Sequence, residues 1–170
     1  MGNSITLKRI PEMILSMSNG LTSAFVSTFG LSGSIIAKTE QEKKLVIYIL
    51  EKNQSIFGIG FVDFDIGSMP WDLKNLEDNK NFVFSILDGM RNKSGWEKLP
   101  FAPNEEMLNR CICEFKNMIL EMKTEDINVI EINEWLKNPK LNDLIKNGFP
   151  LCPSHKVLMT IYACQICTDW

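Results

Sequence analysis

The sequence predicts an α+β fold, in which amphipathic helices cover one face of an antiparallel β-meander and a small separate segment follows. Between Leu21 and Ile66 the apolar segments are short, rich in β-branched and aromatic residues, and interrupted by glycines. After Pro70 the apolar residues recur at the spacing of amphipathic helices. A run of strands followed by a run of such helices favours an α+β domain with the helices packed on one face of the sheet.

Length and composition indicate one main domain with a small appendage. With 170 residues, of which 45% are hydrophobic, the chain can bury one good core. We expect this domain to span 1–149 and a small tail packed on it to span 150–170. The formal net charge is −3, and the 18 basic residues are scattered among 21 acidic ones. Such a surface lacks the basic stripe typical of nucleic-acid-binding proteins, so we expect no nucleic-acid partner.

The first half of the chain predicts the sheet. Residues 13–37 carry no charge, but Ser, Thr, Asn and Gly interrupt them repeatedly. A membrane-spanning helix needs a longer strongly apolar run, so this segment indicates buried strands and no membrane partner. The apolar run 45–50 predicts a further buried strand, followed by a turn over 51–54 and a strand over 56–64. The alternative for the run 45–50 is a helix over 40–52, capped by Thr39.

The second half predicts helices with one apolar face. One helix begins near residue 82 and ends near Gly95, and a longer one begins at Asn104, whose side chain suits an N-cap. Two shorter helices follow near 133–137 and 141–146. The apolar face of the first helix consists of Phe82, Val83, Ile86, Leu87 and Met90, and that of the second of Met107, Leu108, Cys111, Phe115, Met118, Ile119 and Met122.

Four side chains that can bind a metal lie in the tail. Cys152 and His155 are separated by two residues, as are Cys164 and Cys167, and eight residues lie between the two pairs. His155 is the only histidine of the chain. A pair at this spacing lets one tight turn direct two ligands at one ion. Three thiolates and one imidazole fill the tetrahedral shell of Zn²⁺ and leave no position for water, so the sequence predicts a structural zinc site.

The cysteines also have other interpretations. Those of the tail can be reduced core thiols or a redox pair. A redox Cys-x-x-Cys pair stands at the start of a helix, whereas only three residues follow Cys167, and this disfavours redox catalysis. Cys111 and Cys113 fall on different sides of their predicted helix, so Cys111 is expected in the core and the two cannot share a metal. An odd number of cysteines without a convincing signal peptide favours a reducing, cytoplasmic compartment.

Two resemblances add to these expectations. The last part of the tail, about twenty residues, resembles a zinc ribbon or zinc knuckle. The order of features in the main domain, from Phe57 to Asp63, then Trp71, the helix from Phe82 and the segment at Trp96, resembles small bacterial proteins of the immunity or antitoxin kind. Proteins of that kind cover a toxin and need no active site. The resemblance therefore implies a non-enzymatic, protein-binding module in the cytoplasm, with a toxin domain as its partner.

A second hypothesis is a metal-dependent hydrolase or transferase. Asp63 and Asp65 flank Phe64 near the end of the last predicted strand, and strand alternation would place both carboxylates on one face. Asp72 or Glu77 would supply a further ligand. The competing interpretation is that these are solvated residues at a strand end. With the one histidine assigned to the metal, no residue remains for histidine-based acid-base catalysis.

Overall fold

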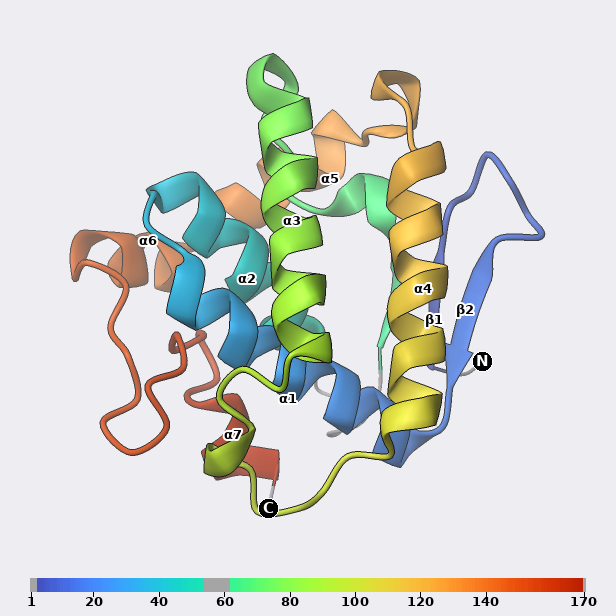
Figure 1. Ribbon diagram of the computed structural model, residues 1–170. Coiled ribbons are helices and arrows are strands. Elements are labelled where there is room, and N and C mark those ends of the chain that lie inside the picture. The colour runs from blue at the N-terminus through green and yellow to red at the C-terminus, as the bar shows by residue number, and fades with distance from the viewer. Residues whose placement is uncertain (1–2, 54–61, 170) are drawn as a thin grey trace.

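The computed structural model describes residues 3–53 and 62–169 and has an α+β fold in which helices predominate (Figure 1). This agrees with the fold class that the sequence predicts. The elements in chain order are β1 Asn3–Thr6, β2 Ile14–Met17, α1 Asn19–Ile36, α2 Glu40–Asn53, β3 Asp63–Asp65, α3 Leu76–Arg91, α4 Glu105–Glu121, α5 Val129–Leu136, α6 Pro139–Lys146 and α7 Gln165–Asp169.

Helix α1 lies at the centre of the molecule. Helix α2 packs along it, α3 and α4 stand side by side across it, and α7 contacts another side (Figure 1). Every residue of α1 from Leu21 to Gly33 is buried. Two glycines let α2 come close, because a Cβ at Gly30 would lie 2.5 Å from Leu50 Cδ2 and one at Gly33 would lie 2.6 Å from Val46 Cγ2. The core of the protein is therefore built around α1.

Most of the strand predictions for the first half of the chain are wrong. Within 13–37 only β2 is a strand, and α1 occupies the rest of the segment from Asn19 to Ile36. The run 45–50 lies in α2, and none of its side chains is more than 3% exposed. A helix buried on all sides has no polar face, so its sequence looks like that of a buried strand.

The alternative helix over 40–52 is confirmed as α2, and so is its cap. The hydroxyl of Thr39 accepts a hydrogen bond from the backbone N–H of Glu42 at 3.1 Å. The carboxylate of Glu42 in turn accepts the backbone N–H of Thr39 at 3.1 Å. This reciprocal capping box satisfies N–H groups that the first turn leaves without helical partners.

The sheet has three short strands in the order β2-β1-β3. Strand β1 pairs antiparallel with β2, where Ile5 lies opposite Leu15, and parallel with β3, where Ile5 lies opposite Phe64. The predicted antiparallel meander is thus only partly right, because the sheet is mixed. The turn predicted over 51–54 is wrong at 51–53, which belong to α2. Residues 54–61 of this turn and of the strand predicted over 56–64 lie outside the described residues.

The amphipathic helices of the second half are confirmed, but α3 begins at Leu76, earlier than predicted, and Met107, predicted on the apolar face of α4, is exposed. Helix α3 ends shortly before Gly95, which has a left-handed conformation with φ 77°. Helix α4 begins after Asn104, whose side chain accepts the N–H of Met107 at 3.1 Å. Helices α5 and α6 occupy the places of the two shorter predicted helices. Helix α4 closes the core with an edge-to-face contact between the rings of Phe25 and Phe115, whose centroids are 5.5 Å apart.

The tail packs against α1. The N–H of Leu158 donates a hydrogen bond to the hydroxyl of Ser34 in α1 at 3.0 Å. Val157, Leu158 and Ile166 are buried, so apolar side chains as well as this bond attach the tail. The segment has little regular structure before α7, with isolated bridges between Leu151 and Leu158 and between 160 and 163.

Candidate metal centre

Two turns of the tail carry the four predicted ligands. The first turn holds Cys152 and His155, and the N–H of Lys156 closes it by donating to the carbonyl of Cys152 at 2.8 Å. Lys156 has a left-handed conformation with φ 56°, which redirects the chain after the turn. The second turn begins at Cys164 and continues into α7, where the N–H of Thr168 donates to the carbonyl of Cys164 at 3.1 Å.

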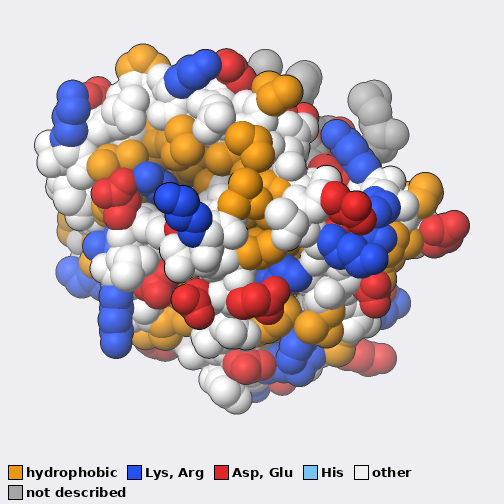
Figure 2. Space-filling view, turned by 90° about the horizontal axis from the view of Figure 1, so that it is seen from above, with side chains coloured by type: hydrophobic (Ala, Val, Ile, Leu, Met, Phe, Trp, Pro, Cys, Tyr) orange, Lys and Arg blue, Asp and Glu red, His pale blue; other side chains and the backbone are white. Residues whose placement is uncertain are grey.

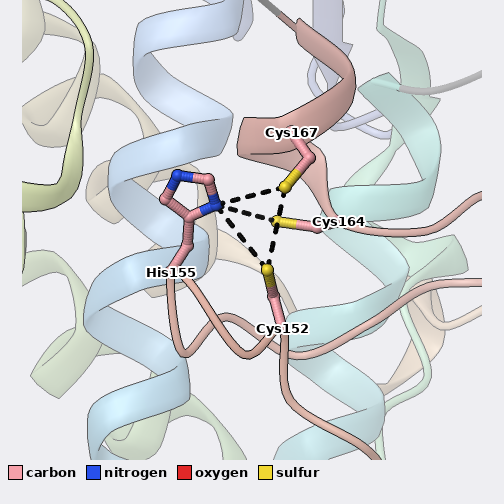
Figure 3. Close-up of side chains that lie close together, drawn as sticks. All are labelled: Cys152, His155, Cys164 and Cys167. Carbon is pink, nitrogen blue, oxygen red and sulfur yellow. Dashed lines mark hydrogen bonds between the residues drawn. The ribbon is translucent and has the colours of Figure 1, made fainter.

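The four ligand atoms converge on one point, as Figure 3 shows, and all lie within 4.8 Å of one another. The Nδ1 atom of His155 lies 3.6 Å from Cys164 Sγ and 3.7 Å from Cys152 Sγ. It lies 3.3 Å from Cys167 Sγ. The sulfur atoms of Cys152 and Cys167 are 3.7 Å apart. Nδ1 is therefore the ligand atom of the ring, and Nε2 points away from the sulfurs.

These separations match the edges of a tetrahedron around a metal ion. With bonds of about 2.3 Å to sulfur and about 2.0 Å to nitrogen, two sulfur corners lie about 3.8 Å apart and a sulfur and a nitrogen corner about 3.5 Å apart. The sulfur pair at 3.7 Å and the nitrogen–sulfur separations of 3.3 to 3.7 Å agree with these values to within about 0.2 Å. The four residues can therefore chelate one metal ion.

Backbone N–H groups point at two of the sulfur atoms. Burial alone would raise the pKa of Cys152, but hydrogen bonds from the N–H groups of His155 and Ser154 outweigh burial and lower this pKa to about 6. At Cys164 burial is the largest effect and raises the pKa to about 12, although the N–H of Cys167 opposes it. A bound cation favours the thiolate form at both positions, because metal ligation requires deprotonated cysteine.

The site is buried on one side and open on the other. Cys152 is 4% exposed and Cys164 is 2% exposed, whereas Cys167 is exposed. His155 is half-buried between them. The protein thus covers two ligands with its own core and leaves the fourth at the surface.

A buried carboxylate that the sequence did not indicate supports the segment between the two turns. Glu51 of α2 accepts the indole N–H of Trp135 at 2.6 Å and the backbone N–H of Ile161. Burial raises the pKa of Glu51, and these two hydrogen bonds oppose that rise. Glu51 directly follows the apolar run 45–50, where a strand and turn were predicted, so nothing in the pattern marked it as an inward-facing group.

The structure brings together all four residues that the sequence proposed as ligands. The spacer of eight residues is long enough, because the two turns face each other across a short loop. One expectation about this region is wrong. The Cys-x-x-Cys pair does stand at the start of a helix, since α7 begins at Gln165 directly after Cys164. The absence of a helix is therefore no argument against redox chemistry here.

The acidic residues of the second hypothesis do not gather into a comparable site. Asp65 is buried, and it accepts hydrogen bonds from the N–H groups of Lys8 at 2.6 Å and Gly67 at 2.9 Å. Asp63 is exposed. Asp72 caps the short 3₁₀ turn Leu73–Asn75. Among the residues that the structure describes, the tail cluster is the only group of three or more His, Cys, Asp or Glu side chains close enough to hold a metal.

The remaining cysteines agree with their predicted places. Cys111 is buried in the core, and burial raises its pKa to about 11. Cys113 is exposed, and the guanidinium of Arg91 donates to its sulfur at 2.9 Å. Neither sulfur belongs to the metal cluster.

Comparison with known proteins adds no relative. No protein-family model, no curated protein and no solved structure matches the chain. Within residues 3–53 and 62–169, no helix has both the length and the apolar composition that crossing a membrane requires. The function is therefore inferred from the residues of the chain itself.

Proposed function

We propose that the chain holds one structural Zn²⁺ ion through Cys152, His155, Cys164 and Cys167. The observation that carries this proposal is the convergence of the four ligand atoms within 4.8 Å of one another. The separations from His155 Nδ1 to the three sulfurs, and between the sulfurs of Cys152 and Cys167, are close to the corner separations of a zinc tetrahedron. Thiolate and imidazole ligands suit zinc, whereas Mg²⁺ and Ca²⁺ bind through oxygen. The wider family of zinc-knuckle elements, which the tail resembles, uses the same kind of ligand set.

The role of this ion is structural. Four protein ligands close the shell, so no coordination position remains for a water molecule that the ion could activate. The two turns that supply the ligands are joined by a loop that contributes only isolated bridges of regular structure. A bound ion cross-links them and so fixes a tail that has too few residues to form a core alone.

Metal analysis of the native protein tests this proposal. The chain is purified without a histidine tag, and its zinc content is measured by inductively coupled plasma mass spectrometry. We expect about one equivalent of zinc per chain. The variant Cys164→Ser should lose it, and the matched control Cys113→Ser, which removes an exposed cysteine outside the cluster, should keep it. A wild-type content below about 0.2 equivalent, or iron in place of zinc, would contradict the proposal.

For the molecule as a whole, we infer a non-enzymatic protein-binding module of the cytoplasm, with an immunity-type inhibitor of a bacterial toxin as its most specific form. Apolar side chains gather in the middle of the face shown in Figure 2, at the end of the molecule where α5 begins. Val129 and Ile130 at the start of α5 are exposed, Ile130 to 77%, and so is Leu73 on the 3₁₀ turn Leu73–Asn75. Clustered exposed apolar residues are typical of interaction sites.

Charged side chains on the same elements suggest the chemistry of the partner. Glu125 and Glu134, next to and within α5, are each about two thirds exposed, and Glu77 at the start of α3 is exposed to 82%. Each of these carboxylates also pairs with a basic side chain of the chain itself, Glu125 with Arg9, Glu134 with Lys137 and Glu77 with Lys80. The formal net charge of −3 is therefore what favours a partner with basic residues around an apolar anchor. A basic toxin domain has this character.

Co-expression with the product of the adjacent gene tests the binding proposal. We expect a stable complex with that product if it is a toxin domain. The variant Ile130→Asp should weaken the complex roughly tenfold or more, because it places a charge in the apolar patch. The control Met107→Asp alters an exposed apolar residue in the first turn of α4, at the other end of the molecule, and should leave the complex intact. Equal losses in both variants would contradict this docking surface.

A further inference from the structure

One thiolate of the metal centre faces solvent while the others are covered. Cys167 lies on α7 and is exposed, whereas Cys152 and Cys164 are buried. A small solute can therefore approach the residue that carries this sulfur without opening the fold. Because a metal ion keeps its cysteine ligands deprotonated, this sulfur is a thiolate, the form in which cysteine reacts with oxidants. This inference rests on the zinc function proposed above.

A sulfur atom of the other turn lies close to that of Cys167. Cys152 Sγ lies 3.7 Å from Cys167 Sγ, and the two residues are 15 positions apart in the chain. A disulfide needs a sulfur–sulfur bond of about 2.05 Å, so the two atoms must approach by less than about 2 Å. The five-residue helix α7 carries Cys167, and a small movement of this short element is enough.

We propose that the metal centre is also a peroxide-sensitive modification site, where oxidation joins Cys167 to Cys152 in a disulfide and releases the zinc ion. The oxidant class is a hydroperoxide, of which hydrogen peroxide is the simplest member. The site then has two states, a zinc-bound reduced state and a zinc-free state with one disulfide.

The chemistry balances in two steps. The thiolate of Cys167 attacks one oxygen of hydrogen peroxide, the O–O bond breaks, and a sulfenic acid and hydroxide form. The thiolate of Cys152 then attacks the sulfenic sulfur, the S–S bond forms, and a second hydroxide leaves. The two thiolates lose two electrons, the peroxide gains them, and two protons from solvent convert both hydroxides to water. Zinc is not oxidised or reduced. It dissociates because two of its four ligands are lost.

A second exposed cysteine, Cys113, can be compared with Cys167. Cys113 is exposed like Cys167, but no second thiol faces it, because its near neighbour Cys111 is buried on another side of α4. The sulfur of Cys113 instead accepts a hydrogen bond from Arg91. Peroxide can oxidise Cys113, but it has no partner for an internal disulfide. Disulfide formation is therefore expected in the metal centre and not at Cys113.

The oxidised state differs from a chain that has merely lost its metal. A disulfide between Cys152 and Cys167 still links the two turns, whereas chelation of zinc frees both. We therefore expect the oxidised tail to keep more of its attachment to α1, including the bond from Leu158 to Ser34, than the reduced, zinc-free tail.

The test uses the zinc-loaded full-length chain carrying Cys113→Ser, which removes the competing exposed thiol. The zinc content is measured first, and hydrogen peroxide is then added in steps. The released zinc is measured with a chelator that changes colour when it binds zinc, and the disulfides are mapped by mass spectrometry. We expect about one zinc ion released per disulfide formed between Cys152 and Cys167. Dithiothreitol with added zinc should restore the starting state.

A second variant keeps the ligand count but removes the exposed thiol. Cys167→His retains four zinc ligands, so it should load with zinc and then release at least tenfold less at the same peroxide dose. The inference is overturned if the loaded protein keeps its zinc at doses that oxidise Cys113 in the wild type, or if the disulfide joins Cys164 to Cys167. Both outcomes leave the zinc proposal standing, whereas a chain that contains no zinc before peroxide is added overturns the zinc proposal and this inference together.

Discussion

Asp63 and Asp65 have the same side chain two positions apart, yet their surroundings differ. Asp65 is buried, and its carboxylate fixes the backbone just after β1 and just after β3 through the N–H groups of Lys8 and Gly67. The hydroxyl of Thr6 adds a longer hydrogen bond at 3.3 Å. Asp63 is exposed. The prediction of a solvated strand end therefore applies to Asp63, while Asp65 acts as an interior cap.

Substitution of the two aspartates should separate these roles. Asp65→Asn should lower the free energy of unfolding by about 1 to 3 kcal/mol. The NH₂ group of the asparagine would replace one carboxylate oxygen and would face a buried backbone N–H, so that neither group could accept a hydrogen bond from the other. Asp63→Asn should change it by less than about 0.5 kcal/mol. Urea unfolding followed by circular dichroism measures both values.

The same two variants examine the enzyme hypothesis. Calorimetric titration of the zinc-loaded wild type with Mg²⁺ and Mn²⁺ should show no saturable site, because the oxygens of Asp65 already accept backbone hydrogen bonds. Saturable binding of either cation that both substitutions abolish would favour a metal-dependent enzyme over a binding protein.

At the residue scale, the tail ligands could be predicted and Glu51 could not. Cys152, His155, Cys164 and Cys167 follow a local spacing, and a turn that places two ligands on one ion is set by that spacing alone. The position of Glu51 depends on Trp135 and on the tail loop, which are distant in the sequence. Its inward orientation is a property of tertiary packing and has no local signature.

At the scale of elements, close packing explains both the helical structure of α1 and the failure to predict it. Gly30 and Gly33 interrupt an apolar segment, which is typical of strands and turns, but here they give α2 the room to lie against α1. The apolar residues of α1 and α2 face the core on all sides, so they show no helical period. Helices α3 and α4 keep a polar face, and their period therefore predicted them correctly.

Substitution of Gly33 measures this packing. Alanine is a better helix former than glycine by about 1 kcal/mol, but its Cβ at this position would lie 2.6 Å from the stiff, buried side chain of Val46. We expect the steric cost to dominate, so that Gly33→Ala lowers the free energy of unfolding by about 1 to 3 kcal/mol. The control is Gly20→Ala in the first turn of α1, where no atom lies within 4 Å of the new Cβ. The free energy of unfolding of that variant should be unchanged or higher by up to about 1 kcal/mol. A similar increase in both variants would contradict the close packing, because it would show that α2 can move away from α1 at little cost.

At the scale of the whole molecule, the pairing of the strands in the mixed sheet could not be predicted from the sequence, because the strands are very short. Strands β1 and β2 have four residues each, and β3 has three. Strand β3 pairs parallel with β1 although α1 and α2 lie between them in the sequence. Such a pairing forms only when the intervening helices have packed, so local alternation cannot reveal it.

Metal removal should act on one part of the molecule. Zinc binding supplies about 10 to 16 kcal/mol in small zinc domains, and residues 150–169 have little core of their own. Chelation, or the variant Cys164→Ser, should therefore raise hydrogen exchange in this tail far more than in α3 and α4. Cys113→Ser should leave the exchange pattern unchanged. An equal rise throughout the chain would mean that the tail is an integral part of the main core.

The bond from Leu158 to Ser34 joins groups 124 positions apart. During synthesis α1 leaves the ribosome long before the segment that covers this side of it. A nascent chain therefore holds its central helix partly uncovered, and the long loop that must close makes this contact one of the slowest to form. On the zinc function proposed above, zinc supply would set how quickly the last side of α1 is covered. A chain made under zinc shortage would expose that side to proteases, so the abundance of the protein would follow the availability of the metal.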